Sequence, residues 1–236
     1  ISISTGYGRT DRAIAYARQY QRHTGITKWT PQNIDGNWNA NASLQYSTPL
    51  GKKEAFQLQG TSAAYYLNSA DFTTDTDEMT RSVVRNLTLS QHLGLTYQFG
   101  QNRVGMEGRV SWLRSRSELR NFPSTDAVDY TAKASGLFHL PQDWEIGSDM
   151  NFYARRGYND ATLNTTHWVW NASLSKLLMR GNLVVKLTAV DLLSQISNLQ
   201  YTINGQGRTE MWINTLPHYV MLGVQYRFHI MPQKKQ

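Results

Sequence analysis

The sequence contains no cysteine, so neither a disulfide framework nor a thiolate metal site is possible. It also lacks a run of about 18 apolar residues, which excludes a transmembrane helix. The chain does not open with a charged and then apolar signal segment but with ISIST, in the middle of a pattern. We therefore expect a chain that was processed or cut from a longer one.

Positive charge is in excess but is not concentrated in one segment. Lysine and arginine together number 24 and the acids 17, which gives a formal net charge of +7. These cations are scattered and no basic helix gathers them, so we expect no nucleic-acid partner. The mean hydropathy of -0.52 is usual for a soluble protein. This average does not detect a barrel strand, however, because such a strand is apolar only at every second residue.

The C-terminal stretch from Tyr219 to Ile230 alternates between apolar and polar side chains. Its even positions are all apolar, whereas its odd positions include Gln225, Arg227 and His229. A period of two predicts a strand whose two faces meet different surroundings. A soluble sheet buries its apolar face in a core, whereas a membrane barrel exposes that face to lipid and turns the polar face to a lumen.

The same period recurs along the chain and predicts about 10 to 13 strands in one all-β domain over residues 1–236. From residue 38 onward the predicted strands are 38–47, 55–67, 87–99, 104–112, 128–138, 146–154, 168–174, 183–189, a less regular strand at 208–214, and 219–230. Two or three more are expected in residues 1–32. Tight turns are predicted at 49–53, 100–102, 141–144 and 180–182, and loops at 68–81, around Pro123 and at 158–164.

Three features favour lipid over a protein core beside the apolar face. Several segments alternate for about the 9 to 11 residues that a tilted strand needs to cross a bilayer. The apolar set contains many alanines and glycines, which would leave voids in a close-packed core. Aromatic residues gather near segment ends, as in the girdles at the membrane surfaces. These aromatics are Trp38, Tyr46, Tyr97, Phe99, Trp112, Trp144, Trp168, Tyr219 and Phe228. We therefore predict a transmembrane antiparallel β-barrel.

Several motifs resemble those of known membrane proteins. Residues 182–194 read NLVVKLTAVDLLS, and with the final Tyr226-Arg227-Phe228 they resemble the C-terminal end of TonB-dependent outer-membrane receptors. The outer-membrane β-barrel family common in Bacteroidetes has similar motifs in the same order. These are QNIDGNW at 32–38, PLGKK at 49–53, WNAS at 170–173 and DLL at 191–193. The resemblance extends over nearly the whole chain from about residue 26.

The resemblance implies a barrel of about 22 strands that is filled by an N-terminal plug domain. This chain would supply roughly its C-terminal half, in the outer membrane of a Gram-negative bacterium. Implied partners are outer-membrane lipid and lipopolysaccharide, TonB through the plug, the barrel-assembly machinery, and a surface lipoprotein or other outer-membrane subunits. The chain departs from the family in three ways: it contains no plug and no TonB box, and eight residues follow Phe228, where many relatives end at the aromatic.

The orientation expected from the resemblance conflicts with the lengths of the loops. A last strand that descends to the periplasm, counted back through the predicted strand at 208–214, places the turns at 180–182 and 141–144 outside the cell. The longer loops would then be periplasmic. Outer-membrane barrels instead have short turns in the periplasm and long loops outside.

Charged residues on the predicted polar faces are the candidate functional residues. They would solvate the lumen or dock a plug, with opposite charges pairing between strands, or they would form a ring that contacts a charged substrate. The candidates are His92, Glu107, Arg109, Asp129, Lys133, His139, Glu145, Asp149, Arg155, Lys186 and Arg227. The resemblance adds Tyr226 and Phe228, either as the signal read by the barrel-assembly machinery or as aromatics that face lipid.

We expect no enzymatic activity. His92 with Ser90, or His139 with Asp129, could be offered as a dyad. Geometry counts against the first pair, because residues two apart on a strand lie too far from each other for an ordered hydrogen bond, and no third orienting group is evident. No phosphate loop, metal-ligand cluster or dinucleotide fingerprint occurs, so no cofactor is expected. Asp191 either ends a strand at the membrane boundary or caps a short turn through Ile196, and both can hold.

The predicted function is uptake of a nutrient by a transporter like the TonB-dependent receptors. One alternative is a structural or accessory barrel subunit of a larger outer-membrane complex. A second alternative is a soluble β-sandwich that acts as a binding module, with the aromatics in an ordinary core.

Overall fold

The computed structural model describes residues 1–21, 23–24, 26–51, 55–74, 79–118, 124–196, 199–204, 207–214 and 216–228. In these ranges ten strands form one antiparallel sheet in the order β1-β4-β5-β6-β7-β8-β9-β10-β11-β14. The strands are β1 (Ser2–Thr10), β4 (Asn37–Leu50), β5 (Phe56–Thr74), β6 (Met79–Phe99), β7 (Asn102–Ser117), β8 (Thr125–Leu140), β9 (Trp144–Arg156), β10 (Thr166–Leu178), β11 (Leu183–Val190) and β14 (Tyr219–Tyr226). The prediction of an all-β, antiparallel fold is confirmed.

Two hairpins stand outside this sheet. The first consists of β2 (Ala13–Gln21) and β3 (Ile26–Ile34), and the second of β12 (Leu199–Asn204) and β13 (Gly207–Trp212). Short 3-10 turns lie at Pro141–Asp143, Ala161–Leu163 and Met179–Gly181. No helix in the described ranges has the length and apolar character needed to span a membrane.

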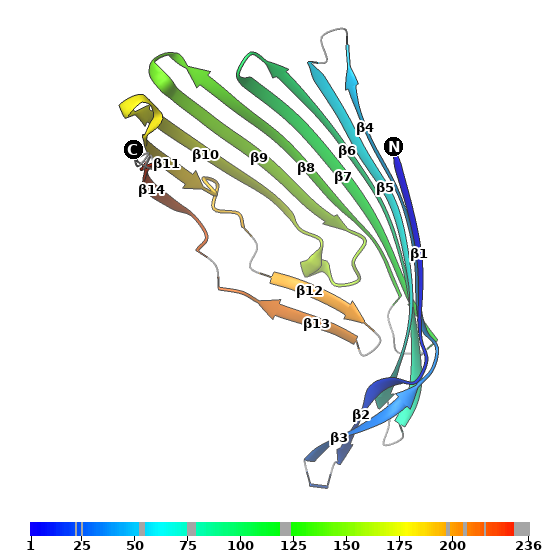
Figure 1. Ribbon diagram of the computed structural model, residues 1–236. Helices are drawn as coiled ribbons and strands as arrows, with labels where there is room; N and C mark the ends of the chain where they lie inside the picture. The colour runs from blue at the N-terminus through cyan, green and yellow to red at the C-terminus, as the bar shows by residue number, and fades with distance from the viewer. Residues whose placement is uncertain are drawn as a thin grey trace, which may run out of the picture.

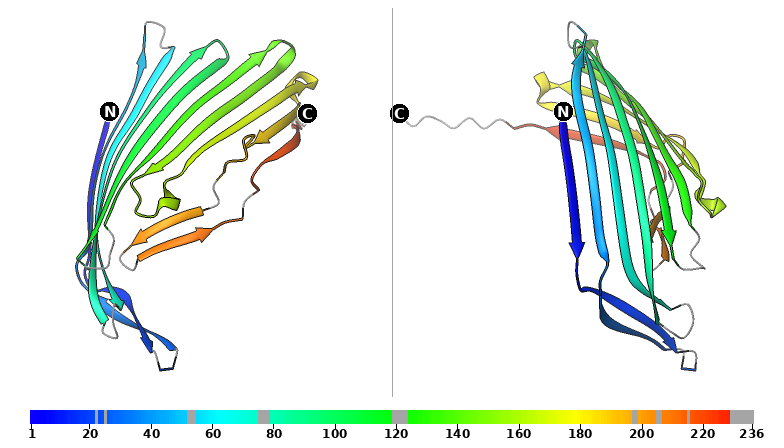
Figure 2. Two further views of the ribbon diagram at one scale, coloured as in Figure 1. Left: turned by 180° about the vertical axis from the view of Figure 1, so that it is seen from behind. Right: turned by 90° about the vertical axis from the view of Figure 1, so that its right-hand side faces the viewer.

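The main sheet is strongly curved and open (Figures 1 and 2). Its strands pair in the order in which they occur in the chain. Only β1 and β14 therefore form its edges. Between these edges the described strands leave the wall unclosed. The ten paired strands therefore form part of a wall.

The ladder register sorts the side chains of the sheet into two faces. In one row across six strands the side chains are all apolar: Leu58, Leu95, Met106, Ala134, Met150 and Trp170. The next row along, on the opposite face, contains Gln59, Gly94, Glu107, Lys133, Asn151 and Val169. The alternation in the sequence is thus in register across the whole sheet, which has one apolar and one polar face.

The apolar face is not covered by a second layer of described residues. Leu93 is 47% exposed and Leu222 66% exposed, although both belong to this face. The total accessible surface is 16897 Å², whereas a compact soluble protein of this mass exposes roughly 11,000 Å². A second sheet or helix packed on the apolar face, which a soluble sandwich requires, is therefore missing from the described structure.

Aromatic residues form a belt near each end of the apolar face. At one end Phe56, Tyr97 and Phe99 stack with ring centroids 4.4 and 5.2 Å apart. At the other end Trp38 stacks on Tyr66 at 4.9 Å. Phe56 and Tyr66 are ten residues apart on β5, which is about 33 Å along a strand. With the usual strand tilt this corresponds to roughly 25 Å across the membrane, the height of the apolar band of outer-membrane barrels.

A small hydrophobic core lies at the end of the sheet where the β2–β3 hairpin packs (Figure 1). It contains Ala15, Ile34, Ala70 and Val83. The loop predicted at 68–81 is therefore wrong over most of its length, because β5 continues to Thr74 and β6 starts at Met79, while residues 75–78 lie outside the described ranges. The polar sequence predicted a loop because a strand that extends beyond a bilayer has no lipid on either side and so loses the alternation.

The connections of the sheet differ in length between its two ends. The turns β4–β5, β6–β7, β8–β9 and β10–β11 have at most five residues each and lie at one end. Left-handed residues make the reversals possible, including Gly100 at φ 59° and Arg180 at φ 56°. The longer connections, at 11–36, 118–124, 157–165 and 191–218, lie at the other end, together with the short β5–β6 connection at 75–78. The turns predicted at 100–102, 141–144 and 180–182 and the loop at 158–164 are confirmed. At 49–53 the strand β4 extends to Leu50, and residues 52–54, like 119–123 around Pro123, lie outside the described ranges.

The prediction that residues 208–214 form a strand of the wall is wrong, and this changes the orientation of the last strand. Residues 207–212 do form a strand, β13, but it pairs with β12, which the sequence did not predict. The sheet itself passes directly from β11 to β14. With one wall strand fewer, β14 ends at the same end of the sheet as the short turns. The conflict between strand direction and loop length is thereby removed.

Candidate functional site on the polar face

The polar face carries the predicted charged residues together. His92 lies opposite Arg109, Glu107 opposite Lys133, and Asp129 opposite Arg155. His139 lies opposite Glu145, Asp149 opposite Ser135 and Asn171, and Lys186 opposite Ser175. Arg227 is the exception, because it follows the end of β14 and its N–H donates to the carbonyl of Asn182 (2.8 Å). Among the described residues, hollows open on this face between β7 and β11, between β4, β5 and β6, and between β8, β9 and β10.

Asp129, at the long-loop end of β8, anchors the β9–β10 loop. Arg155 Nε lies 3.9 Å from Asp129 Oδ1, and the Tyr158 hydroxyl donates to both carboxylate oxygens of Asp129 at 3.0 and 3.2 Å. Burial of the phenol, together with the charge and the hydrogen bond of Asp129, raises the pKa of Tyr158 to about 12. The phenol therefore stays a hydrogen-bond donor through the physiological pH range.

Both histidines on the polar face of β6 and β8 contact carboxylates of neighbouring strands. His92 Nε2 lies 3.6 Å from Glu107 Oε2, and His139 Nε2 lies 3.1 Å from Glu145 Oε2. His139 and Asp129 are ten residues apart on β8 and cannot form the suggested dyad. In the described ranges no three histidines or acids are grouped in a way that could hold a metal.

A chain of amide and carboxylate groups crosses the sheet from β9 to the end of β11. Asp149 accepts hydrogen bonds from the side-chain amides of Asn151 (2.6 Å) and Asn171 (2.9 Å). The side-chain carbonyl of Asn171 accepts the backbone N–H of Asp191 (2.9 Å). The buried carboxylate of Asp191 in turn accepts the N–H groups of Gln195 and Ile196 at 3.1 and 2.9 Å. Asp191 thus follows the end of β11 and caps the turn through Ile196, as predicted.

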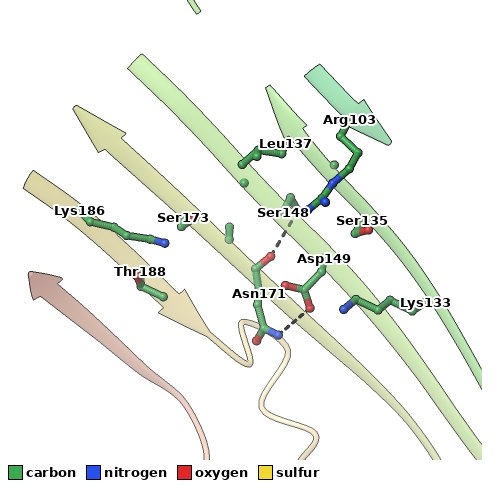
Figure 3. Close-up of a pocket in the computed structure, with 13 residues that line it drawn as sticks. Arg103, Lys133, Ser135, Leu137, Ser148, Asp149, Asn171, Ser173, Lys186 and Thr188 are labelled. Carbon is green, nitrogen blue, oxygen red and sulfur yellow. Dashed lines mark hydrogen bonds between the residues drawn. The ribbon is translucent and has the colours of Figure 1, made fainter. Parts of the chain in front are cut away.

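A hollow of about 330 Å³ lies among β7, β8, β9, β10 and β11 (Figure 3). Its lining includes Arg103, Lys133, Asp149 and Lys186, with hydroxyl groups between them. The sequence predicted Lys133, Asp149 and Lys186 here but missed Arg103 and Asn171. Arg103 and Asn171 alternate in step with the polar residues of their own strands. The alternation alone could therefore have placed both on the polar face.

The two C-terminal aromatics pack against each other. The rings of Tyr226 and Phe228 meet edge to face with centroids 4.6 Å apart. Phe228 follows the end of β14 and is 82% exposed. Tyr226 lies on the apolar face, opposite Leu183. The pair therefore extends the aromatic belt at the short-turn end of the sheet.

Comparison with known proteins gives one family match. Residues 1–226 match the model of a family described as the outer membrane protein beta-barrel family. No curated protein matches the chain. One solved structure, described as a NanC porin in a rhombohedral crystal form, is similar at 9% sequence identity and a TM-score of 0.34. The similarity covers 80% of this chain and 94% of that chain. This similarity is too low to carry a conclusion.

Proposed function

We propose, on the premise that this chain belongs to the outer membrane protein β-barrel family and is located in the outer membrane, that it forms the C-terminal wall of a TonB-dependent transporter that takes up a nutrient. The observation that carries the proposal is the pair of opposite faces, apolar and uncovered on one side, polar and hollowed on the other. Such a wall separates lipid from an aqueous passage.

The open edges of the sheet support a larger barrel of about 22 strands. Each backbone group left without a hydrogen bond in lipid costs several kcal/mol, so a spanning sheet must close on itself. Strands β1 and β14 run in opposite directions along the wall and do not pair. Further strands would join them, and a barrel of that size has a lumen wide enough to need a plug.

The long-loop end of the sheet would face the outside of the cell. Short turns and the C-terminal end of β14 lie together at the opposite end, where Arg227 N–H bonds to the carbonyl of Asn182. Short periplasmic turns and long external loops are usual in outer-membrane barrels. A substrate would then meet the β2–β3 and β12–β13 hairpins first, and the polar face afterwards.

The proposed partners follow from this arrangement. Lipid and lipopolysaccharide would contact the apolar face, TonB would act through the plug, and the barrel-assembly machinery would read Tyr226 and Phe228. A surface lipoprotein or another outer-membrane subunit would meet the long-loop end. We propose no catalytic step; His92 and His139 contact carboxylates of the wall.

The test uses the full-length protein extracted from its native membrane. The periplasmic domain of TonB, immobilised on a resin, is expected to retain it, and the reconstituted protein is expected to show no steady open channel in a planar bilayer. Steady channels without retention by TonB would contradict the proposal and indicate a pore. Neither channels nor retention would favour a structural or accessory subunit.

A further inference from the structure

Three cations surround the hollow among β7 to β11 and lack an anionic partner. Arg103, Lys133 and Lys186 come from three different strands. Within the part of the chain that the structure describes, none of them forms an ion pair or a hydrogen bond. Figure 3 shows the head groups of all three directed inward, toward Asp149 and Asn171. We refer to this site as the basic hollow.

The carboxylates nearest to these cations are engaged elsewhere. Glu107 lies opposite Lys133 in the ladder, but its carboxylate faces His92 at 3.6 Å. Ser175 lies between Lys186 and Glu145 in the ladder. The Glu145 carboxylate contacts His139 at 3.1 Å and accepts a hydrogen bond from Ser175. Asp149 accepts two amide hydrogen bonds. Three cations against the one carboxylate of Asp149 leave the basic hollow with an excess of two positive charges.

The size and lining of the basic hollow suit a molecule rather than a bare ion. Its volume of about 330 Å³ is roughly ten times the share of one water in the liquid. Ser135, Ser173 and Thr188 place hydroxyl groups between the cations. Gly147 has no side chain to occupy the hollow, and a Cβ at this position would come within 2.8 Å of Ser173 Oγ. Charged donors would bind an acidic group, and the hydroxyls would bind the hydroxyls of a solute.

We propose that the basic hollow binds a small hydroxylated solute that carries a carboxylate or a phosphate, such as a sugar acid or a sugar phosphate. This inference rests on the proposed function and names the substrate class for the passage along the wall. Acidic side chains of a plug are the other occupant that this chemistry would accept. The experiment distinguishes the two.

The test is calorimetric titration of the detergent-purified full-length protein at about 0.15 M salt, where distant charges are screened, with gluconate, glucose 6-phosphate and glucose. At least one of the two anions is expected to bind and glucose is not. Lys133→Gln and Lys186→Gln should each weaken anion binding about tenfold, and Lys186→Arg should largely restore it. Gly147→Val fills the hollow without a change of charge and should abolish binding.

Arg109→Gln is the matched control, because Arg109 lies on the same face of β7 as Arg103 but does not line the basic hollow. It should weaken binding by less than about threefold, because Arg109 adds a neighbouring charge but no contact inside the basic hollow, and that charge is partly screened at about 0.15 M salt. An equal loss in this control would indicate general attraction of anions and overturn the proposal. Failure of both anions to bind would also overturn it. A lower unfolding midpoint for Lys133→Gln would then assign the hollow to a plug.

The failure of this inference is separable from that of the proposed function. Retention by TonB with no anion binding overturns only the substrate class. Anion binding without retention by TonB overturns only the transport mechanism, because the Lys133→Gln and Lys186→Gln variants assign the heat of binding to the wall site.

Discussion

Leu187 of β11 and Leu222 of β14 lie directly opposite each other in the sheet, although the whole connection 191–218 separates their strands. The β12–β13 hairpin is therefore an insertion in a loop and contributes no hydrogen bond to the ladder between β11 and β14. The wall and the hairpin can be altered separately.

Replacement of residues 199–212 by a short Gly-Ser linker should leave the wall folded. The expected result is an unchanged heat-dependent shift of mobility in detergent gels, which reports a closed barrel in the full-length protein. Deletion of 219–226 is the control and should abolish the shift, because β11 would lose its partner along eight residues. Loss of the shift on replacement of the hairpin would mean that β12 and β13 belong to the wall.

The absence of cysteine allows the orientation to be measured by labelling single positions. Ala161→Cys lies in the long β9–β10 loop and Gln101→Cys in the short β6–β7 turn, both exposed. In the full-length protein, a membrane-impermeant maleimide added to intact cells should label the first variant and should label the second only after the outer membrane is permeabilised. Any native cysteine outside this chain is first replaced. The reverse pattern would place the long loops in the periplasm.

Charge on the apolar face should destabilise the wall. Leu93→Arg places a cation between the two aromatic belts, where lipid is expected, and should lower the free energy of unfolding by about 2 to 4 kcal/mol. Ser90→Arg, on the polar face of the same strand, should cost less than about 1 kcal/mol. Unfolding by guanidinium in phospholipid vesicles measures both. Equal costs would show that the two faces meet the same surroundings.

A polar pair on the apolar face should be coupled. The Ser62 hydroxyl donates to Gln91 Oε1 at 2.5 Å, and Gln91 Nε2 donates to the carbonyl of His92 at 3.1 Å. Ser62→Ala alone should cost roughly 1 kcal/mol, because it leaves the Gln91 amide oxygen without its donor on a face where lipid offers none. The double variant Ser62→Ala with Gln91→Leu should recover most of that loss. A purely additive double-mutant cycle in the same unfolding assay would contradict the coupling.

The contact between Tyr158 and Asp129 should make the loop sensitive to alkali. The pKa of Tyr158 is raised to about 12, whereas an unfolded tyrosine titrates near about 10. A raised pKa stabilises the folded state fully below the unfolded value, and the effect is lost as pH rises from about 10 to about 12. The difference in tyrosinate absorbance between the wild type and Tyr158→Phe should therefore show one group that titrates near pH 12. A difference centred near pH 10 would mean that the phenol is not held by Asp129.

The alternation of side chains in the sequence predicts the faces of the sheet well but not its pairing. Trp38 to Ser47 predicts β4 because lipid and water select the parity of each residue within the bilayer. The same rule fails at Asn68 to Arg81, where the strands leave the bilayer and a hairpin provides the packing instead. It also fails for β12 and β13, because which strands pair across the connection 191–218 depends on contacts between distant segments.

The candidate residues show the same division. Their parity placed Lys133, Asp149 and Lys186 on one face in the sequence. That Glu107 faces His92 diagonally rather than Lys133 directly depends on rotamers, which the alternation does not encode. The three unpaired cations of the basic hollow therefore emerge only when the neighbouring carboxylates are located.

The small core beside the β2–β3 hairpin is the one hydrophobic cluster of buried residues in the described structure, and it lies beyond the membrane-spanning rows. The spanning wall therefore has no dry interior of its own that could form in water. Insertion and folding of these strands must then be a single event. Until it reaches the bilayer, the unfolded chain would need periplasmic chaperones that cover its apolar side chains.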